Sequence, residues 1–257
     1  MRSPQTCRVA IAALALLLVL RPGRADEPKP PARADAGDGF ESIFDGKTLD
    51  GWRAPDMGFW RVEDGAITGE VTKDHRPTEN VFIVWQGGAV GDFELRFRFR
   101  IFGPAANSGM QFRSEVKERG LVHGYQADMS GDGRLVGNLY DEYGPRHALA
   151  DRGQRVRFDA GGHKTVESFG DPFAGKPPDV SQWTDYTIRA EGEHITLQVN
   201  GKTTIELFDG DAEHRKLTGV LAMPVITSEM KVQFKDIRLK RLGGESAKQQ
   251  EKAGTKP

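Results

Sequence analysis

A strict alternation of apolar and charged residues constrains the fold of this chain more than any other feature. From residue 93 to residue 101 the sequence reads FELRFRFRI, with apolar side chains at odd positions and charged ones at even positions. A period of two places the two kinds of side chain on opposite faces of a strand, whereas a helix would mix them around its axis. The segment therefore predicts a long amphipathic strand with one face in a hydrophobic core.

The same alternation recurs through the chain and is interrupted at turn signals. Residues 187–207 alternate on both sides of Asn200-Gly201, a pair that favours a two-residue turn, and this predicts a hairpin. Near the C-terminal end the apolar positions change from even to odd numbers at Lys235 and Asp236, which indicates a β-bulge. Further strands are expected over residues 60–68, 81–85, 109–115, 121–129, 134–140, 155–158, 164–169, 183–190 and 219–223. No segment predicts a helix longer than one or two turns.

Many short strands joined by Gly-rich turns predict an all-β fold. We expect a two-sheet antiparallel β-sandwich of the jelly-roll kind, formed by residues 40–242 as one domain with one core. If one of the sheets curves, its outer face is concave and suits an extended polar ligand such as a sugar.

The N-terminal residues have the pattern of a secretory signal. Residues 1–25 begin with Arg2 and Arg8, continue through the apolar run 9–20, and end in small residues before Ala25. The apolar run is shorter than the roughly 20 residues of a membrane span, so we expect cleavage near Ala25, export to the periplasm or beyond, and no membrane anchor afterwards. Cys7 is the single cysteine and lies before the apolar run, so disulfides are not expected in the mature chain.

The flanking segments and the charge balance narrow the classes of partner. Residues 26–39 are rich in Pro, Ala and charge, and residues 243–257 in Lys, Gln and Gly, so we expect a disordered linker and a disordered tail. With 36 basic and 37 acidic residues the net charge is -1, which gives no electrostatic reason to expect nucleic acid or an anionic membrane as partner. A neutral or small ligand fits better, and the sequence predicts no oligomeric state.

Polar residues concentrate in residues 107–144. Alternation places Arg113 outward on one expected strand and Gln126 and Asp128 outward on the next, opposite to Tyr125. If these strands are neighbours, Arg113 and Asp128 meet, either as a plain cross-strand ion pair or as part of a binding site.

Further candidate groups lie in the same stretch. Tyr140, Asp141 and Glu142 bring carboxylates to a strand end. Paired carboxylates act either as acid and base or as ligands of a hard cation such as calcium, and their spacing alone does not choose between these uses. His123 also lies here, whereas the other histidines have no metal-ligand spacing and indicate no zinc site.

A set of short motifs then gives a resemblance to a known family. In chain order they are Gly39-Phe40, Leu49-Asp50-Gly51-Trp52, Trp60-Arg61-Val62-Glu63-Asp64-Gly65, Asp92-Phe93-Glu94-Leu95, Asn107-Ser108-Gly109, Gly124-Tyr125-Gln126, Leu139-Tyr140-Asp141-Glu142, residues 183–186, Asn200-Gly201 and Phe234-Lys235-Asp236-Ile237. Their order and spacing resemble the 3-keto-disaccharide hydrolase family, formerly a domain of unknown function. The resemblance implies a concanavalin A-like lectin/glucanase jelly roll, an exported protein, and a carbohydrate substrate oxidised to a ketone at carbon 3.

The resemblance also implies a pocket and a chemistry. The pocket residues it indicates are Asn107, Ser108, Gly109, Arg113, Tyr125, Gln126, Asp128, Tyr140, Asp141 and Glu142. A ketone at carbon 3 acidifies the hydrogen on carbon 2, so a base can remove it while a donor or cation stabilises the enolate. The group on carbon 1 then leaves, and water adds.

Roles follow from that chemistry. We assign Asp128 as the base, Glu142 or Asp141 as the group that assists the leaving group or holds a divalent cation, and Arg113 or the cation as the enolate stabiliser. The substrate-positioning residues would be Asn107, Ser108, His123, Tyr125, Gln126 and Tyr140.

One departure from the family pattern leaves an alternative open. Members of the family commonly carry Leu-Gln-x-His-Gly or Leu-Gln-x-His-Ala-Gly before the last strand, where this chain reads Leu221-Ala222-Met223-Pro224-Val225-Ile226-Thr227-Ser228-Glu229. Either His123 or Glu229 replaces the missing histidine, or the protein is a non-catalytic carbohydrate-binding module of the cell envelope.

Overall fold

The computed structural model describes residues 33–34 and 38–243, and these are almost entirely strand and turn. The strands are β1 (Arg33–Ala34), β2 (Glu41–Ser42), β3 (Trp52–Arg53), β4 (Trp60–Glu63), β5 (Ala66–Val71), β6 (Val81–Trp85), β7 (Phe93–Phe102), β8 (Asn107–Val116), β9 (Val122–Ser130), β10 (Leu139–Glu142), β11 (His147–Ala150), β12 (Gln154–Phe158), β13 (Lys164–Ser168), β14 (Thr184–Glu191), β15 (His194–Val199), β16 (Lys202–Asp209), β17 (Val220–Val225) and β18 (Met230–Arg241). The helical elements within these residues are two 3-10 turns, η1 (Met57–Phe59) and η2 (Glu118–Gly120).

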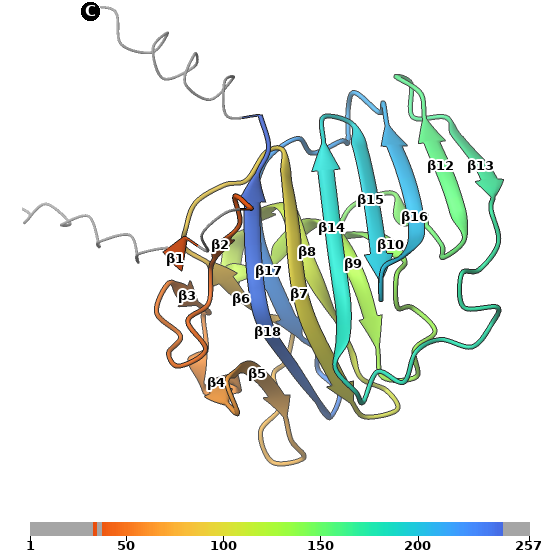
Figure 1. The fold of residues 1–257 in the computed structure, drawn as a ribbon. Coiled ribbons are helices and arrows are strands. Elements are labelled where there is room, and N and C mark those ends of the chain that lie inside the picture. Colours follow the sequence, from red (N-terminus) through yellow and green to blue (C-terminus); the bar gives the residue numbers. More distant parts are fainter. Residues whose placement is uncertain (1–32, 35–37, 244–257) are drawn as a thin grey trace, which may run out of the picture.

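The strands form two sheets that pack face to face (Figure 1). The large sheet has eleven strands in the order β1-β2-β18-β7-β14-β15-β16-β12-β13, with β5 paired to β18 and β4 paired to β5. The small sheet has seven strands in the order β11-β10-β9-β8-β17-β6-β3. Neighbours are antiparallel except β12 and β16, which run parallel. The predicted jelly-roll sandwich is confirmed.

Alternation explains how each sheet contributes to the shared core. In β7 the apolar odd positions are buried; Phe97 stacks on Tyr186 of β14, and Phe99 packs against the same ring at a tilt. In β9 of the small sheet Tyr125 and Ala127 point into the same core. The even positions of β9 consequently face outward, and this orientation positions the candidate site.

Two local predictions are confirmed in detail. Asn200 and Gly201 have φ angles of 49° and 73°, the left-handed conformation that a type I′ hairpin turn between β15 and β16 requires. The register of β18 against β7 shifts between Lys235 and Arg238, and Asp236 has φ 53°, as expected for a bulge.

The strand expected over residues 134–140 is wrong. Strand β10 begins only at Leu139, and residues 131–138 form a loop closed by its own hydrogen bonds. The Asp132 carboxylate accepts from the backbone N–H of Arg134 at 3.0 Å, and the N–H of Leu135 donates to Ser130 Oγ at 2.9 Å. Short-range hydrogen bonds of this kind give the backbone N–H groups acceptors within the loop, so they compete with the pairing of strands.

Several predictions concern residues outside the described ones. The signal peptide with its cysteine, most of the linker and nearly all of the C-terminal tail lie there. In the part that is described, no helix has the length and apolar character needed to cross a membrane.

Candidate functional site

A strip of polar side chains follows the outer face of the small sheet along β8, β9 and β10. Gln111 of β8 and Tyr140 of β10 flank Gln126 of β9 in register, and Gly109 lies opposite Asp128. We call this set the polar strip, and its members are Asn107, Gln111, Gln126, Asp128, Ser130, Tyr140 and Glu142. Of the predicted site residues, the structure thus brings together Asn107, Gln126, Asp128, Tyr140 and Glu142.

A chain of hydrogen bonds runs along the strip and ends at Asp128. Ser114 Oγ donates to Gln111 Oε1 at 2.7 Å, and Gln111 Nε2 donates to Gln126 Oε1 at 3.3 Å. Gln126 Nε2 then donates to Asp128 Oδ1 at 2.9 Å. Because each amide uses its oxygen on one side, its N–H groups must point to the other side. The relay therefore orients a donor at the Asp128 carboxylate.

Gly109 leaves room for this arrangement. A Cβ atom at position 109 would lie 2.5 Å from Cγ of Gln126 and 2.9 Å from the carbonyl oxygen of Ala127. Any side chain there would displace Gln126 and weaken its bond to Asp128. The motif Asn107-Ser108-Gly109 thus has a steric reason to end in glycine.

Asp128 is buried without a cation beside it. Its exposed fraction is 6 %, and within the described residues no Lys, Arg or His forms an ion pair with it. Burial raises the pKa of the Asp128 carboxyl to about 7, the hydrogen bond from Gln126 opposes the rise, and the charges of Glu142 and Asp151 add to it. A carboxyl group with this pKa can exchange protons efficiently near neutral pH.

Glu142 is a second carboxyl group with reduced acidity. Burial raises its pKa, although Asn80 Nδ2 donates a long hydrogen bond of 3.5 Å to its Oε1. Tyr140 shares the outward face with Glu142, and its hydroxyl lies 3.3 Å from Nδ1 of His147. The strip therefore contains two carboxyl groups and a phenol, of which Glu142 and Tyr140 are partly exposed.

The rest of this outer face is apolar and covered. The outward side chains Phe82 and Val84 of β6 and Ala222 of β17 form a buried cluster with Val122 at the start of β9. Leu121, at the end of the β8–β9 connection, and Val220 pack against this cluster. Arg119 at the tip of the connection pairs with Glu79 at 3.2 Å, and Gly120 lies against Pro55. Along the polar strip, Asn107, Tyr140 and Glu142 are partly exposed, whereas Gln111, Gln126, Asp128 and Ser130 are buried.

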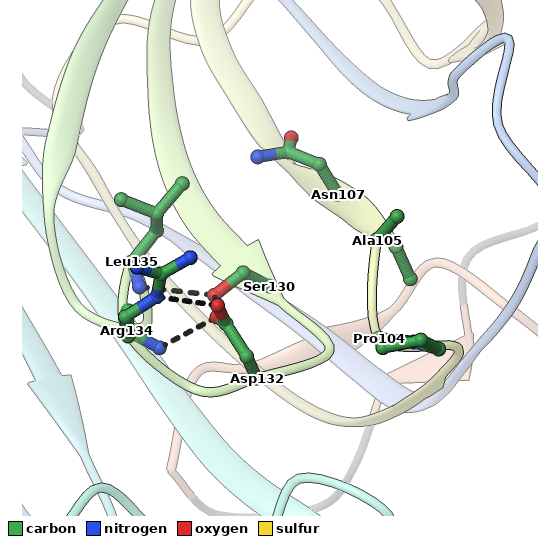
Figure 2. A pocket seen from close by; sticks show the side chains of 8 residues that line it. Pro104, Ala105, Asn107, Ser130, Asp132, Arg134 and Leu135 are labelled. Atoms are coloured by element: carbon green, nitrogen blue, oxygen red, sulfur yellow. Dashed lines mark hydrogen bonds and ion pairs between the residues drawn. The ribbon is translucent and has the colours of Figure 1, made fainter.

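A cavity of about 400 Å³ adjoins the strip at its Asn107 end (Figure 2). Residues 104–107 line one side, and Ser130, Asp132, Arg134 and Leu135 line the other. Because Asn107 pairs with Ser130, the cavity begins two residues, or about 7 Å, along the strands from Asp128. A pocket of this size can bury a small ligand.

The predicted meeting of Arg113 and Asp128 is wrong. The register of β8 shifts between Phe112 and Glu115, and Arg113 has φ 47°, so its side chain leaves the outward face. It is fully buried, pairs with Asp92 at 2.9 Å, and donates to the carbonyl oxygens of Gly91 at 2.9 Å and Gly192 at 2.6 Å. Arg113 ties loops together and lies away from the strip.

Asp141 and Tyr125 belong to a different group of charges on the inner side of β9 and β10. Arg146 binds Asp209 through bonds of 2.8 and 2.9 Å and approaches Asp141 at 3.5 Å. The Tyr125 hydroxyl donates to Asp209, and burial followed by this charge raises the pKa of Tyr125. We call this set the Arg146 cluster, and its members are Tyr125, Asp141, Arg146, Asp209, Asp211 and His214. None of these groups joins Asp128 on the strip.

Ser108 and His123 also lie apart from the strip. Ser108 is buried, and its Oγ donates to the carbonyl oxygen of Pro224 at 2.7 Å, so it links β8 to β17. His123 stacks on Tyr143 with ring centroids 4.8 Å apart. Burial, followed by the charge of Lys117, lowers the pKa of His123.

Some members of the site were not predicted from the sequence. Gln111 and Ser114 complete the relay, and Asn80 reaches Glu142 from a distant part of the chain. Alternation in β8 could have indicated Gln111, whereas no local signal points to Asn80.

Comparison with known families now adds to this geometry. Residues 39–240 match the family described as the 3-keto-alpha-glucoside-1,2-lyase-like domain. The chain belongs to this family. The match covers nearly the whole described part of the chain, so the polar strip and the Arg146 cluster both lie inside the 3-keto-alpha-glucoside-1,2-lyase-like domain.

Solved structures share the fold of this domain. A Parabacteroides distasonis ATCC 8503 protein named as a candidate glycosyl hydrolase aligns with a TM-score of 0.53 and 19 % identity over 80 % of this chain and 94 % of that chain. A Bacillus subtilis protein of unknown function with a galectin-like fold aligns with a TM-score of 0.52 and 11 % identity over 75 % of this chain and 90 % of that chain. Identities this low show a common fold only. A comparison with curated protein sequences gave no match.

Family and fold together identify a carbohydrate-active or carbohydrate-binding jelly roll. The family's histidine motif can now be located in this structure. If Leu221 matches the leucine of the motif, Pro224 occupies the histidine position, on the outer face of β17 beside Phe82. Glu229, one of the two expected substitutes, instead pairs with Arg76 at an exposed turn.

The sequence did not decide whether the carboxyl groups of the site hold a metal ion. Across the residues described, no three His, Cys, Asp or Glu side chains gather in a way that could hold a metal ion. Asp128 and Glu142 are the pair on the strip that could contribute to such a site with other ligands. The divalent cation stays a prediction.

Proposed function

We propose that this protein is an exported enzyme that cleaves 3-keto-glycosides, including 3-keto-disaccharides, by elimination followed by hydration. The observation that carries the proposal is Asp128, a buried carboxyl group of the polar strip that has no cation beside it within the described residues and has a pKa of about 7. This pKa suits a base that must be ionised at neutral pH and still bind the proton it removes. Family membership supports the choice of a ketone at carbon 3.

In the first step Asp128 takes the proton from carbon 2 of the sugar. The electron pair of the broken C–H bond forms a double bond between carbons 2 and 3, and the ketone oxygen becomes an enolate. The relay through Gln126 holds Oδ1 of Asp128, so Oδ2 is the oxygen that would take the proton. Tyr140 pairs with Gln126, the outward residue of β9 next to Asp128, and its partly exposed ring positions the sugar.

In the second step the enolate re-forms the ketone, and the bond from carbon 1 to its oxygen breaks. A double bond forms between carbons 1 and 2, and the departing oxygen takes a proton from Glu142. Burial raises the pKa of Glu142, which favours the protonated form that this step requires.

Hydration completes the reaction. Water adds to carbon 1 and gives a proton to the Glu142 carboxylate, while Asp128 returns its proton to carbon 2. Both acids regain their starting states, and the overall change is hydrolysis. The predicted signal peptide would place this reaction in the periplasm or outside the cell.

The experiment is incubation of the purified chain, beginning after Ala25, with 3-keto-trehalose or a 3-keto-glucoside. We expect release of the leaving sugar or alcohol, and no release from the same glycoside without the ketone. Chromatography of the products at pH 7 to 8, with and without divalent cations, measures both. If neither ketone substrate is cleaved under any of these conditions, the enzymatic proposal is wrong.

A second candidate function is supported by Pro224. Because the family's histidine position carries a proline beside the covered apolar cluster, the same strip would serve a non-catalytic carbohydrate-binding module. Sugar binding measured by calorimetry, together with no turnover of either ketone substrate, is the result that favours this alternative.

A further inference from the structure

Asn107 is a hydrogen-bond donor on the wall of the cavity beside the strip. Its half-buried amide lines the cavity and makes no side-chain hydrogen bond to any described residue. Of the other polar groups there, Ser130 Oγ donates to Asp132 at 2.8 Å, and Arg134, which pairs with Asp132 through its Nε at 2.5 Å, is largely exposed. Figure 2 shows Asn107 on the opposite wall from these groups. A ligand in the cavity would therefore find a free amide on that wall.

The order of groups along the strip gives a bound sugar a direction. Asn107 pairs with Ser130, Asp128 with Gly109 two residues further, and Glu142 lies opposite Gly124 at the other end of β9. Asp128 thus lies between Asn107 and Glu142 along the strands. In the sugar, carbon 2 likewise lies between carbon 1 and the ketone at carbon 3.

Matching these two orders fixes which end of the ring faces the cavity. If Asp128 acts on carbon 2 and Glu142 protonates the oxygen on carbon 1, the ketone at carbon 3 points toward Asn107. The leaving group then extends past Glu142. The covered apolar cluster around Phe82 blocks a placement over β6 and β17.

We propose that Asn107 donates the hydrogen bond that stabilises the enolate oxygen at carbon 3, and that the cavity between residues 104–107 and 130–135 receives the ketone side of the ring. This inference rests on the proposed function. It replaces the role expected of Arg113, whose guanidinium is committed to Asp92, Gly91 and Gly192. A preorganised donor aimed at a developing oxyanion is a large contributor to catalysis of this type.

The kinetic test compares Asn107→Ala with Gln198→Ala in the full-length mature chain. Gln198 is a half-buried amide on β15 of the large sheet, so its removal matches the chemical change but leaves the strip intact. We expect Asn107→Ala to lower kcat on a 3-keto-glucoside by about 10²- to 10³-fold and to raise KM by no more than about 10-fold, because the donor binds the enolate oxygen more strongly than the ketone oxygen of the bound substrate. Gln198→Ala should keep the parent kcat.

An isotope effect separates this role from a general loss of structure. With a 3-keto-glucoside deuterated at carbon 2, the isotope effect on kcat should be at least as large in Asn107→Ala as in the parent, because proton removal has become slower. Unchanged kcat in a folded Asn107→Ala protein would overturn the inference while leaving the proposed function intact. If the parent itself cleaves no ketone substrate, the proposed function fails first.

A binding measurement keeps the inference testable in that case. In an Asp128→Asn background, which lacks the base, we expect a 3-keto-glucoside to bind more tightly than the glucoside, and Asn107→Ala to reduce this preference by roughly 2- to 10-fold. A preference that does not depend on Asn107 would contradict the assignment.

Discussion

Two groups of buried or half-buried acids lie on opposite faces of the small sheet, and they differ in whether a cation is bound to them. On the outer face Asp128 and Glu142 have no cation bound to them within the described residues. On the inner side Asp141, Asp209 and Asp211 surround the guanidinium of Arg146. The two groups are close in sequence, since Asp141 and Glu142 are neighbours.

The consequence appears in their acidities. Burial works to raise the pKa of Asp211, but hydrogen bonds from His214 and the charge of Arg146 outweigh it, and the pKa is lowered. For Asp128 burial prevails, and the pKa is raised to about 7. A compensated buried acid stabilises the structure, whereas an uncompensated one is available for proton transfer at the expense of stability. The acids of the Arg146 cluster therefore stabilise the fold, whereas Asp128 is suited to proton transfer.

The largest expected effect is on activity when the uncompensated acid is removed. Asp128→Asn should lower kcat/KM on a 3-keto-glucoside by roughly 10²- to 10⁴-fold, because the amide cannot accept the proton from carbon 2. Arg146→Met should instead lower the free energy of unfolding by about 3 to 5 kcal/mol, since three acids would lose their cation.

Urea denaturation and initial rates, measured on both variants, check that one loses activity and the other loses stability. At a temperature where Arg146→Met is folded, its kcat per folded molecule should stay near the parent value. If Arg146→Met abolished turnover while folded, or Asp128→Asn left turnover intact, the distinction between the two groups would be wrong.

A smaller effect is expected on the pH dependence of stability. The Asp128 pKa rises from 3.8 to about 7 on folding, so between these values the folded state binds more protons than the unfolded state. Stability contributed by this group is therefore present at pH 4 and is lost as the pH rises through 7.

The variant Asp128→Asn has no carboxyl group at this position, so its stability does not fall as this group ionises. Comparing the variant with the parent therefore measures the effect. Relative to the parent, the variant should gain up to about 2 to 4 kcal/mol between pH 4 and pH 8. Thermal denaturation of both proteins across this range gives the difference. A constant offset at all pH values would mean that the Asp128 pKa is not raised.

The fold and part of the site could be predicted from alternation alone. In β9 the period of two separated Tyr125, which points to the core, from Gln126 and Asp128, which face outward. The same rule places Asp141 and Glu142 on opposite faces of β10, so it contained the distinction between the two groups of acids.

What alternation could not predict depends on local backbone exceptions and on distant partners. Arg113 has a positive φ that is unusual for a residue other than glycine, and this single bulge reverses its side chain. The partners of Asp141 lie at Arg146 and, through it, at Asp209, which is far along the chain. The contact of Gly120 with Pro55, which closes the apolar part of the outer face, is equally non-local. No spacing rule connects such segments.

The smallest expected effect concerns the relay that holds Asp128. Gln126→Met removes the one side-chain donor to the Asp128 carboxylate within the described residues, and since this bond opposes the effect of burial, the pKa of Asp128 should rise further. At pH 6 to 7 the rate should fall by about 3- to 10-fold because less of the base is ionised, and most of it should return by pH 9. Ser114→Ala, at the far end of the relay, should shift the same profile less. A Gln126→Met profile that falls equally at every pH would indicate that Gln126 positions the sugar and does not tune the base.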